Sequence, residues 1–304
     1  MVYDKALNIF KTVTIAEVEL FKDRYDAEAV LVIPKSHTSD GKARYVSLVT
    51  MSVLTPESGS VATSESTSGT DITMYWGGYG KDLSGLTNYT TVAAYPSIPL
   101  DDASVATRDY AYIPSTSFSS GNIASLDGVS YYYSNTLTER FAPSPYLVDG
   151  SVNQIYRTAG QGFCDMDGSG NTNVIIATCD PSELVSGGTV TNSSGLVGSY
   201  ESHAPAVTCH RYHTDHSNAG DWYLPSAGEA GYLISRLKEI DATLTALKGL
   251  GYRAVNVTNS VWLWTSTEYS ANHARYVGTG SGDCSIDGKS NLSTLYRVRA
   301  FRAY

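Results

Sequence analysis

The stretch GDWYLPSAGEAGYL, residues 220–233, decides the fold because it contains the clearest helix start in the chain. Ser226 and Glu229 form an S-x-x-E capping box directly behind Pro225, in which both side chains would satisfy free amide groups of the first helical turn. Apolar residues then recur at helical spacing at Ala230, Leu233, Leu237 and Ile240. The pattern predicts one main helix over residues 226–248, which continues or restarts in its second half.

Three runs near the N-terminus alternate apolar or β-branched residues with polar ones, as strands do: residues 13–21, 27–33 and 44–53. The second and third runs are separated by PKSHTSDGK, whose Asp40-Gly41 pair is a hairpin turn signal. We therefore expect strands throughout this region and a β-hairpin over residues 27–53.

The remaining segments complete an α+β chain. The segment YRVRAFRAY (296–304) alternates well enough to predict a closing strand that ties it into a sheet. A stretch rich in Tyr and Pro, residues 95–157, has neither helical nor sustained strand periodicity and is interpreted as a long, loop-rich insertion. Residues 1–26 are interpreted as an N-terminal arm for assembly or attachment, and residues 27–304 as one domain.

Composition favours a recognition protein and argues against nucleic-acid binding. A chain of 304 residues with 42% hydrophobic residues can bury a substantial core. Its 30 acidic residues outnumber 21 basic ones, whereas nucleic-acid binding normally needs a concentrated basic face. Charged residues are sparse at 17% while Gly and Tyr are plentiful, which is typical of rigid, loop-rich recognition surfaces displayed outside a cell.

The sequence also argues against membrane insertion and against a disulfide scaffold. MVYDKALNIFKTVT lacks the basic and apolar regions of a signal peptide, and no later segment is long and apolar enough to span a bilayer. The cysteines are too few for a disulfide framework in a chain of this size and form no CxxC pair. We expect free thiols at Cys164, Cys179, Cys209 and Cys284.

Two segments contain residue types that bind metals. In CHRYHTDH, Cys209, His210, His213 and His216 are close in sequence, but their spacing matches no paired zinc pattern, and a solvated histidine-rich loop is favoured. In DMDGSGNT, Asp165 and Asp167 occupy loop positions one and three of a calcium-binding EF-hand. Position twelve is Ile176 where a bidentate Glu is needed, so a tight Asp/Gly turn is favoured and the two aspartates stay only candidate metal ligands.

Catalysis has no visible motif in this chain. The sequence contains no G-x-S-x-G elbow, phosphate-cradling glycine loop or H-E-x-x-H helix, and its carboxylates are dispersed. Trp222, Trp262 and Trp264 could stack a sugar or a peptide side chain, but core packing is the better default. Within LWTSTE, Glu268 is expected to cap or pair with a local group.

Several segments in a fixed order carry a family resemblance. The main ones are GDWYLPSAGEAGYL (220–233), VWLWTSTEYSANHARYV (261–277), a Gly/Ser/Asp-rich stretch and YRVRAFRAY (296–304). In this order they resemble the variable proteins of diversity-generating retroelements, known chiefly from gut Bacteroides, their phages and related bacteria. The resemblance implies a C-type-lectin-like fold, related to that of formylglycine-generating enzymes, with a variable region over about residues 264–304.

The resemblance also implies which positions vary. In such families a reverse transcriptase miscopies adenines, so Asn codons of the AAC type scatter and cannot yield Lys, Glu, Gln, Met or Trp. Between residues 269 and 304 the sole member of that excluded set is Lys289. The positions that match the Asn-rich family pattern, called the variable set below, are His273, Tyr276, Gly278, Gly280, Ser281, Asp283, Ser285, Ile286, Asp287 and Gly288. A wider interpretation adds residues 291–294.

The intervening positions are expected to form an invariant scaffold that holds the backbone while its neighbours point outward: Ala274, Val277, Gly282, Lys289 and Ser290. The roles of Arg275, Thr279 and Cys284 stay open. Within the variable set, Tyr276 and His273 are the expected binding anchors and Ile286 the apolar one.

These expectations describe a ligand-binding or receptor-binding protein and not an enzyme. The partner would be a protein or glycan receptor on a target cell, bound without a cofactor. The chain would sit on a phage tail in the virion or act as an adhesin on a bacterial cell surface, where homo-oligomeric display would add avidity. One alternative is a calcium-dependent sugar-binding lectin, although its E-P-N, Q-P-D and W-N-D tripeptides are missing. The other is an enzyme of the formylglycine-generating type, although Cys209 and Cys284 lie in no thiol motif.

Overall fold

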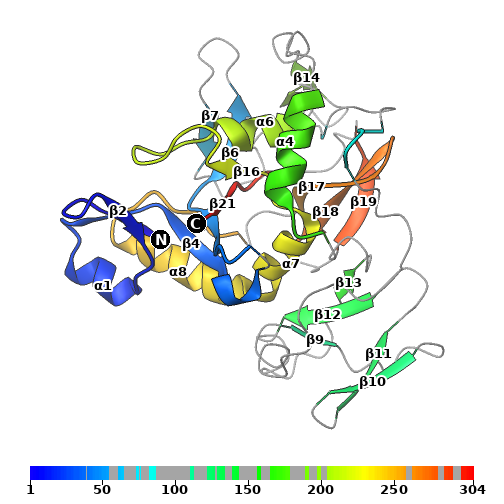
Figure 1. Cartoon of the computed structure of the whole chain (residues 1–304), viewed down its shortest axis with the longest axis horizontal. Coiled ribbons are helices and arrows are strands. Elements are labelled where there is room, and N and C mark those ends of the chain that lie inside the picture. Colours follow the sequence, from blue (N-terminus) through cyan, green and yellow to red (C-terminus); the bar gives the residue numbers. More distant parts are fainter. Residues whose placement is uncertain are drawn as a thin grey trace.

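The computed structural model describes residues 1–38, 40–54, 61–64, 73–74, 76, 82–86, 110–112, 122–126, 129–133, 139–143, 156–158, 165–178, 189–191, 197–199, 204–257, 262–279, 284–289 and 296–304. These residues form an α+β protein with few helices and several mostly antiparallel sheets, as the sequence predicts (Figure 1). None of the helices in this part of the chain combines the length and the apolar character that crossing a bilayer requires.

The first residues form a small sheet and a helix instead of strands alone. The sheet has the order β2-β1-β3, from β1 (Val2–Asp4), β2 (Ile9–Lys11) and β3 (Tyr25–Ala27). Between them, α1 (Ile15–Leu20) begins at a capping box of Thr14 and Glu17, so the strand predicted over residues 13–21 is wrong. The alternation was misleading because a helix of six residues is too short to show its period, whereas T-x-x-E is a helix-start signal.

The N-terminal segment shares the main hydrophobic core of the molecule. Val2 and Val18 are each 2% exposed and belong to one apolar cluster with Leu233 and Phe301. The inner face of residues 1–26, interpreted from sequence as an arm, therefore packs against distant parts of the chain.

A four-stranded sheet joins the predicted hairpin to the C-terminal strand. Its order is β16-β21-β5-β4, from β4 (Ala29–Ile33), β5 (Arg44–Ser47), β16 (Trp222–Tyr223) and β21 (Phe301–Ala303). β4 and β5 pair antiparallel, which confirms the predicted hairpin as far as Ser47, and the 3-10 helix η1 (Lys35–His37) and Gly41, at a φ of 66°, lie between them. The rest of the predicted second strand is wrong, because residues 50–54 pair with residues 61–64 in another sheet. The predicted closing strand is divided, because β20 (Tyr296–Arg297) joins another sheet and Val298 bridges Met51 before β21 begins.

The predicted main helix is two helices, α7 (Ala227–Ser235) and α8 (Leu237–Gly249). The capping box of Ser226 and Glu229 starts α7, as predicted. Arg236 separates the helices at φ −110° and ψ 17°, and its Nη1 donates to the carbonyl oxygen of Val32 in β4 at 2.9 Å. Both helices pack against β4 (Figure 1). Their buried face contains the predicted apolar positions Ala230, Leu233, Leu237, Ile240, Leu244 and Leu247.

A second apolar cluster involves the helices α4 (Gly168–Thr178) and α6 (Ala204–Arg211). The DMDGSGNT segment, predicted as a tight turn, continues into α4, because Asp167 accepts a hydrogen bond from the amide of Gly170 at 2.8 Å, as a residue at a helix start does. Trp222 and Trp264 are fully buried in this cluster, which confirms their predicted place in the core.

The remaining strands are short. Those within the predicted insertion are β9 (Tyr110–Tyr112), β10 (Asn122–Leu126), β11 (Val129–Tyr133), β12 (Glu139–Pro143) and β13 (Tyr156–Thr158). β10 pairs with β11, and β12 pairs with both β9 and β13. Elsewhere lie β6 (Thr50–Leu54), β7 (Val61–Ser64), β8 (Thr73–Met74), β14 (Thr189–Thr191) and β15 (Val197–Ser199).

Candidate functional site

Two adjacent antiparallel strands carry the described part of the variable set. These strands are β18 (His273–Gly278) and β19 (Cys284–Gly288), and β17 (Trp262–Ser270) pairs with the other edge of β18 (Figure 1). The register places Tyr276 opposite Ser285 and His273 opposite Gly288. Residues that are distant in sequence are thus held next to one another by a regular hydrogen-bonded ladder.

The variable set is divided between the two faces of this sheet. Side chains alternate along a strand, so Tyr276 and Asp287 lie on one face while His273 and Ile286 lie on the other. All four are partly exposed, whereas Gly278 is buried. The predicted positions therefore do not form one continuous patch on the described strands.

The face with Tyr276 carries a cluster of aromatic rings from β17, β18 and β20. Trp264 stacks on Tyr296 with ring centroids 4.0 Å apart, and Tyr276 meets Tyr296 edge to face at 5.0 Å. Trp262 lies 6.3 Å from Tyr276. Trp264 and Tyr296 are buried, but Trp262 and Tyr276 are partly exposed. The hydroxyl of Tyr296 donates to the Asp287 carboxylate. The packed aromatic rings therefore lie beside a carboxylate.

The predicted scaffold positions are buried where the structure describes them. Ala274, Val277 and Lys289 each have 0% exposure. Two of the positions that were left open, Arg275 and Thr279, are also buried, at 2% exposure each. Arg275 lies over the ring of Tyr269 at 5.2 Å. These side chains therefore belong to the interior and are not available to a partner.

Lys289 is held by a buried ion pair. Its Nζ donates to Glu268 Oε1, and it lies 4.8 Å from the centroid of the Trp76 ring. Glu268 also accepts from the amide of Leu83 at 3.2 Å. Burial raises the pKa of Glu268 and lowers that of Lys289, because both charged forms lose water. Glu268 was predicted to pair with a local group, and its partner lies 21 residues further along the chain.

Several predicted positions lie outside the described residues: Gly280, Gly282, Ser281, Asp283, Ser290 and residues 291–294. Cys284 lies opposite Val277 in the strand register. Cys209 is a free, buried thiol in α6, as predicted for that residue.

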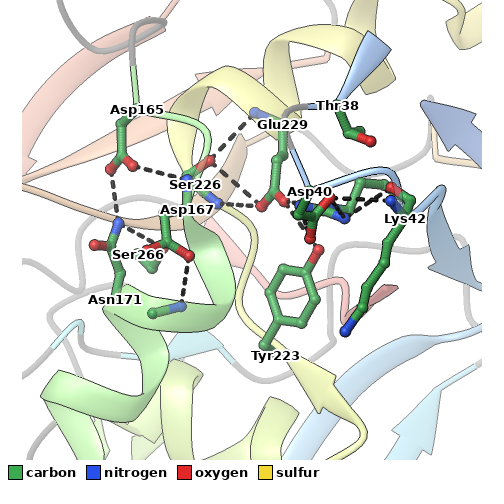
Figure 2. A network of polar contacts seen from close by, with 12 residues as sticks. Thr38, Asp40, Lys42, Asp165, Asp167, Asn171, Tyr223, Ser226, Glu229 and Ser266 are labelled. Atoms are coloured by element: carbon green, nitrogen blue, oxygen red, sulfur yellow. Dashed lines mark hydrogen bonds and ion pairs between the residues drawn. The ribbon is translucent and has the colours of Figure 1, made fainter. Parts of the chain in front are cut away.

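Asp165, one of the two candidate metal ligands, uses its carboxylate inside the protein. It accepts from the side-chain amide of Asn171 at 2.7 Å and from the backbone amide of Asp167 at 3.2 Å (Figure 2). It also accepts from the hydroxyl of Thr267. Burial raises the pKa of Asp165. Across the described ranges, no three His, Cys, Asp or Glu side chains gather closely enough to hold a metal ion. The arrangement is that of a structural carboxylate that joins α4 to β17.

The same network extends to a second buried carboxylate, Glu229, at the start of α7. Glu229 Oε1 accepts from the Tyr223 hydroxyl at 2.9 Å (Figure 2). It also accepts from Arg44 Nε at 2.8 Å. The two halves of the network meet at Gly168, where a Cβ atom would lie 2.6 Å from the amide nitrogen of Ser226 and closer still to Glu229 Oε2. Burial raises the pKa of Glu229 to about 7.

Stability is expected to fall as pH rises from about 4.5 to 7, in part because of Glu229. Its usual pKa is 4.5, so in this window the folded state binds more protons than the unfolded state. The loss from this one group is on the order of 3 kcal/mol, its full pKa difference expressed as free energy. Urea unfolding of Glu229→Gln at pH 5 and pH 8 measures it, because the variant lacks the titrating group. An equal pH slope in both proteins would exclude Glu229 as the cause.

The side chains of the histidine-rich segment make separate contacts and do not gather into a group of metal ligands among the described residues. His216 Nε2 lies 2.9 Å from Asp26 Oδ2, and its ring stacks on Tyr3 at 3.8 Å. His213 is exposed and contacts the carbonyl oxygen of Arg211. Through His216, the segment after α6 therefore contacts both β3 and β1.

No family model, curated protein or solved structure matches the chain. Sequence reasoning missed two ion pairs that the fold brings together, Arg44 with Glu229 and Lys289 with Glu268. The first pair is separated by 185 residues, so no local spacing could indicate it. For the second pair, the sequence did offer a signal. Lys289 is the sole residue between positions 269 and 304 of a type that miscopied Asn codons cannot yield.

Proposed function

We propose that the chain is a ligand-binding protein whose partner is recognised by variable side chains on and around β18 and β19. The observation that supports this most directly is the distribution of burial along these strands. Ala274 and Val277, assigned to the scaffold, are fully buried, whereas Tyr276 and Ile286, assigned to the variable set, are partly exposed. A surface that changes its side chains without losing its fold needs this division.

Binding energy in this proposal comes from few side chains on a preorganised backbone. Trp262 and Tyr276 offer partly exposed aromatic rings that are already packed against Trp264 and Tyr296, so little conformational entropy is lost on binding. Asp287 adds a hydrogen-bond acceptor on the same face. A protein or glycan receptor on a target cell suits these groups, with a phage tail or a bacterial surface as the place of display.

The C-type-lectin-like frame is part of the proposal. It is supported by the order of the sequence motifs and by the way α7 and β17, which carry the two longest motifs, contact each other. The proposal assigns the chain no catalytic role.

Sequencing the gene and its surroundings in many sister isolates tests the proposed function. We expect substitutions concentrated at the variable set, a near-identical template repeat and a neighbouring reverse-transcriptase gene. Substitutions spread evenly over residues 264–304, without such a repeat, would overturn the proposal.

Two matched substitutions test, in the protein itself, the difference between buried scaffold positions and partly exposed variable positions. Ile286→Asn is expected to cost less than about 1 kcal/mol of unfolding free energy, because Ile286 is partly exposed. Val277→Asn is expected to cost about 3 kcal/mol or more, because it places an amide in the core beside β17. Urea denaturation measures both. Equal costs would show that exposure does not separate the two classes of position.

A further inference from the structure

A polar pocket of about 490 Å³ lies on elements other than β17, β18 and β19. One wall comes from residues 26–28, at the end of β3 and just before β4, and another from residues 212–216, which follow α6. Leu48, Val49 and Tyr252 add apolar surface. A volume in this range suits a small organic molecule.

Glu28 is the pocket's most unusual lining residue. Its side chain is only 5% exposed, and Oε2 has no hydrogen-bond partner among the residues that the structure describes. Thr214, His216 and Arg302 lie near enough to stabilise the charge of this carboxylate, but burial still raises its pKa. A buried carboxylate oxygen without a donor is costly, and a donor from a ligand would remove that cost.

The charge of the pocket favours a cation as that donor. Its lining residues include three carboxylates, Asp26, Glu28 and Asp215, against the single guanidinium of Arg253. Asp26 is already engaged by Lys5 at 3.1 Å and by His216 at 2.9 Å. Glu28 is therefore the buried carboxylate of the pocket with acceptor capacity left for a ligand.

We propose that this pocket binds a small organic cation, a guanidinium or primary ammonium group on a short alkyl chain, with Glu28 as the principal acceptor. The charged head lies between Glu28 and Asp215, and the alkyl part lies along Leu48, Val49 and Tyr252. The site is separate in its residues from the variable set, so the proposal stands whether or not the strands β18 and β19 vary.

Isothermal titration with n-butylguanidinium and with its uncharged analogue n-butylurea tests the proposal on the unmodified protein. We expect measurable binding of the cation and binding of the urea weaker by at least about tenfold, because hydrogen bonds to a charged group are the stronger ones. No binding of the cation, or equal binding of both compounds, overturns the proposal, and the free Glu28 oxygen would then be hydrated by a water molecule.

Variants locate the site. Glu28→Gln, checked for folding by its thermal melting curve, and the exposed wall variant Asp215→Asn should each weaken binding of the cation, the first by at least about tenfold. Glu19→Gln, which removes an exposed carboxylate on α1, is the matched control and should leave binding unchanged. Unchanged binding in both pocket variants would overturn the assignment.

A third ligand separates two sources of the cation. Binding of Nα-acetyl-arginine methylamide as tight as that of n-butylguanidinium would indicate a side chain presented by a polypeptide. Loss of binding for this larger compound, with n-butylguanidinium retained, would indicate a free small molecule.

Discussion

Gly168→Ala is expected to lower the free energy of unfolding by about 3 kcal/mol or more. A Cβ at this position would lie 2.6 Å from the amide nitrogen of Ser226 and 2.8 Å from the carbonyl oxygen of Leu224. Both are backbone atoms, so no side chain can rotate away to make room. It would also displace Glu229 from the bonds that hold Arg44 and Tyr223. Urea denaturation at pH 7 measures the loss.

Gly249→Ala is the matched control for that substitution. Gly249 is the last residue of α8, and a Cβ there meets no atom within 4 Å. Alanine favours a helix over glycine by up to about 1 kcal/mol, so this variant should be as stable as the parent or slightly more so. Similar losses in both variants would show that the close approach at Gly168 does not decide its cost.

Lys289→Met is expected to destabilise the protein by about 3–5 kcal/mol. The substitution removes the ammonium group but leaves Glu268 buried without its cationic partner, and burial of an uncompensated carboxylate is costly. Since Lys289 directly follows β19, the end of this strand should also lose protection from amide hydrogen exchange. Chemical denaturation and hydrogen exchange measure the two effects.

Lys5→Met provides the comparison with an exposed pair. Lys5 and Asp26 are 3.1 Å apart, but their side chains are 44% and 37% exposed, so the loss should be below about 1 kcal/mol. The double variant Glu268→Gln/Lys289→Met should recover part of the loss seen in Lys289→Met, because it no longer buries an unpaired charge. A double variant that is less stable than either single variant would contradict this account.

Local signals in the sequence predicted several elements correctly. The capping box at Ser226 and the hairpin of β4 and β5 depend on residues only a few positions apart, so the sequence alone contains their cause. The same kind of signal was present at Thr14 and Glu17, and α1 was mistaken for a strand because short apolar runs suit either element.

The groups that hold the candidate site together could not be predicted in this way. The bond from Arg44 to Glu229 spans 185 residues, and that from Thr267 to Asp165 spans 102. Such contacts depend on how sheets and helices pack, which no local period encodes. Which residues of β18 and β19 share a face also depends on packing, because it is set by the register in which the two strands pair.

The position of β21 inside its sheet has a consequence for how the chain folds. β21 lies between β16 and β5, yet β5 is formed more than 250 residues earlier in the chain. During synthesis, one edge of β5 therefore stays unpaired until β21 has been made. Unpaired strand edges promote aggregation. Contacts this distant in sequence also slow folding, because a long loop must close before they form. We expect slow refolding after dilution from urea, with a yield that falls as protein concentration rises.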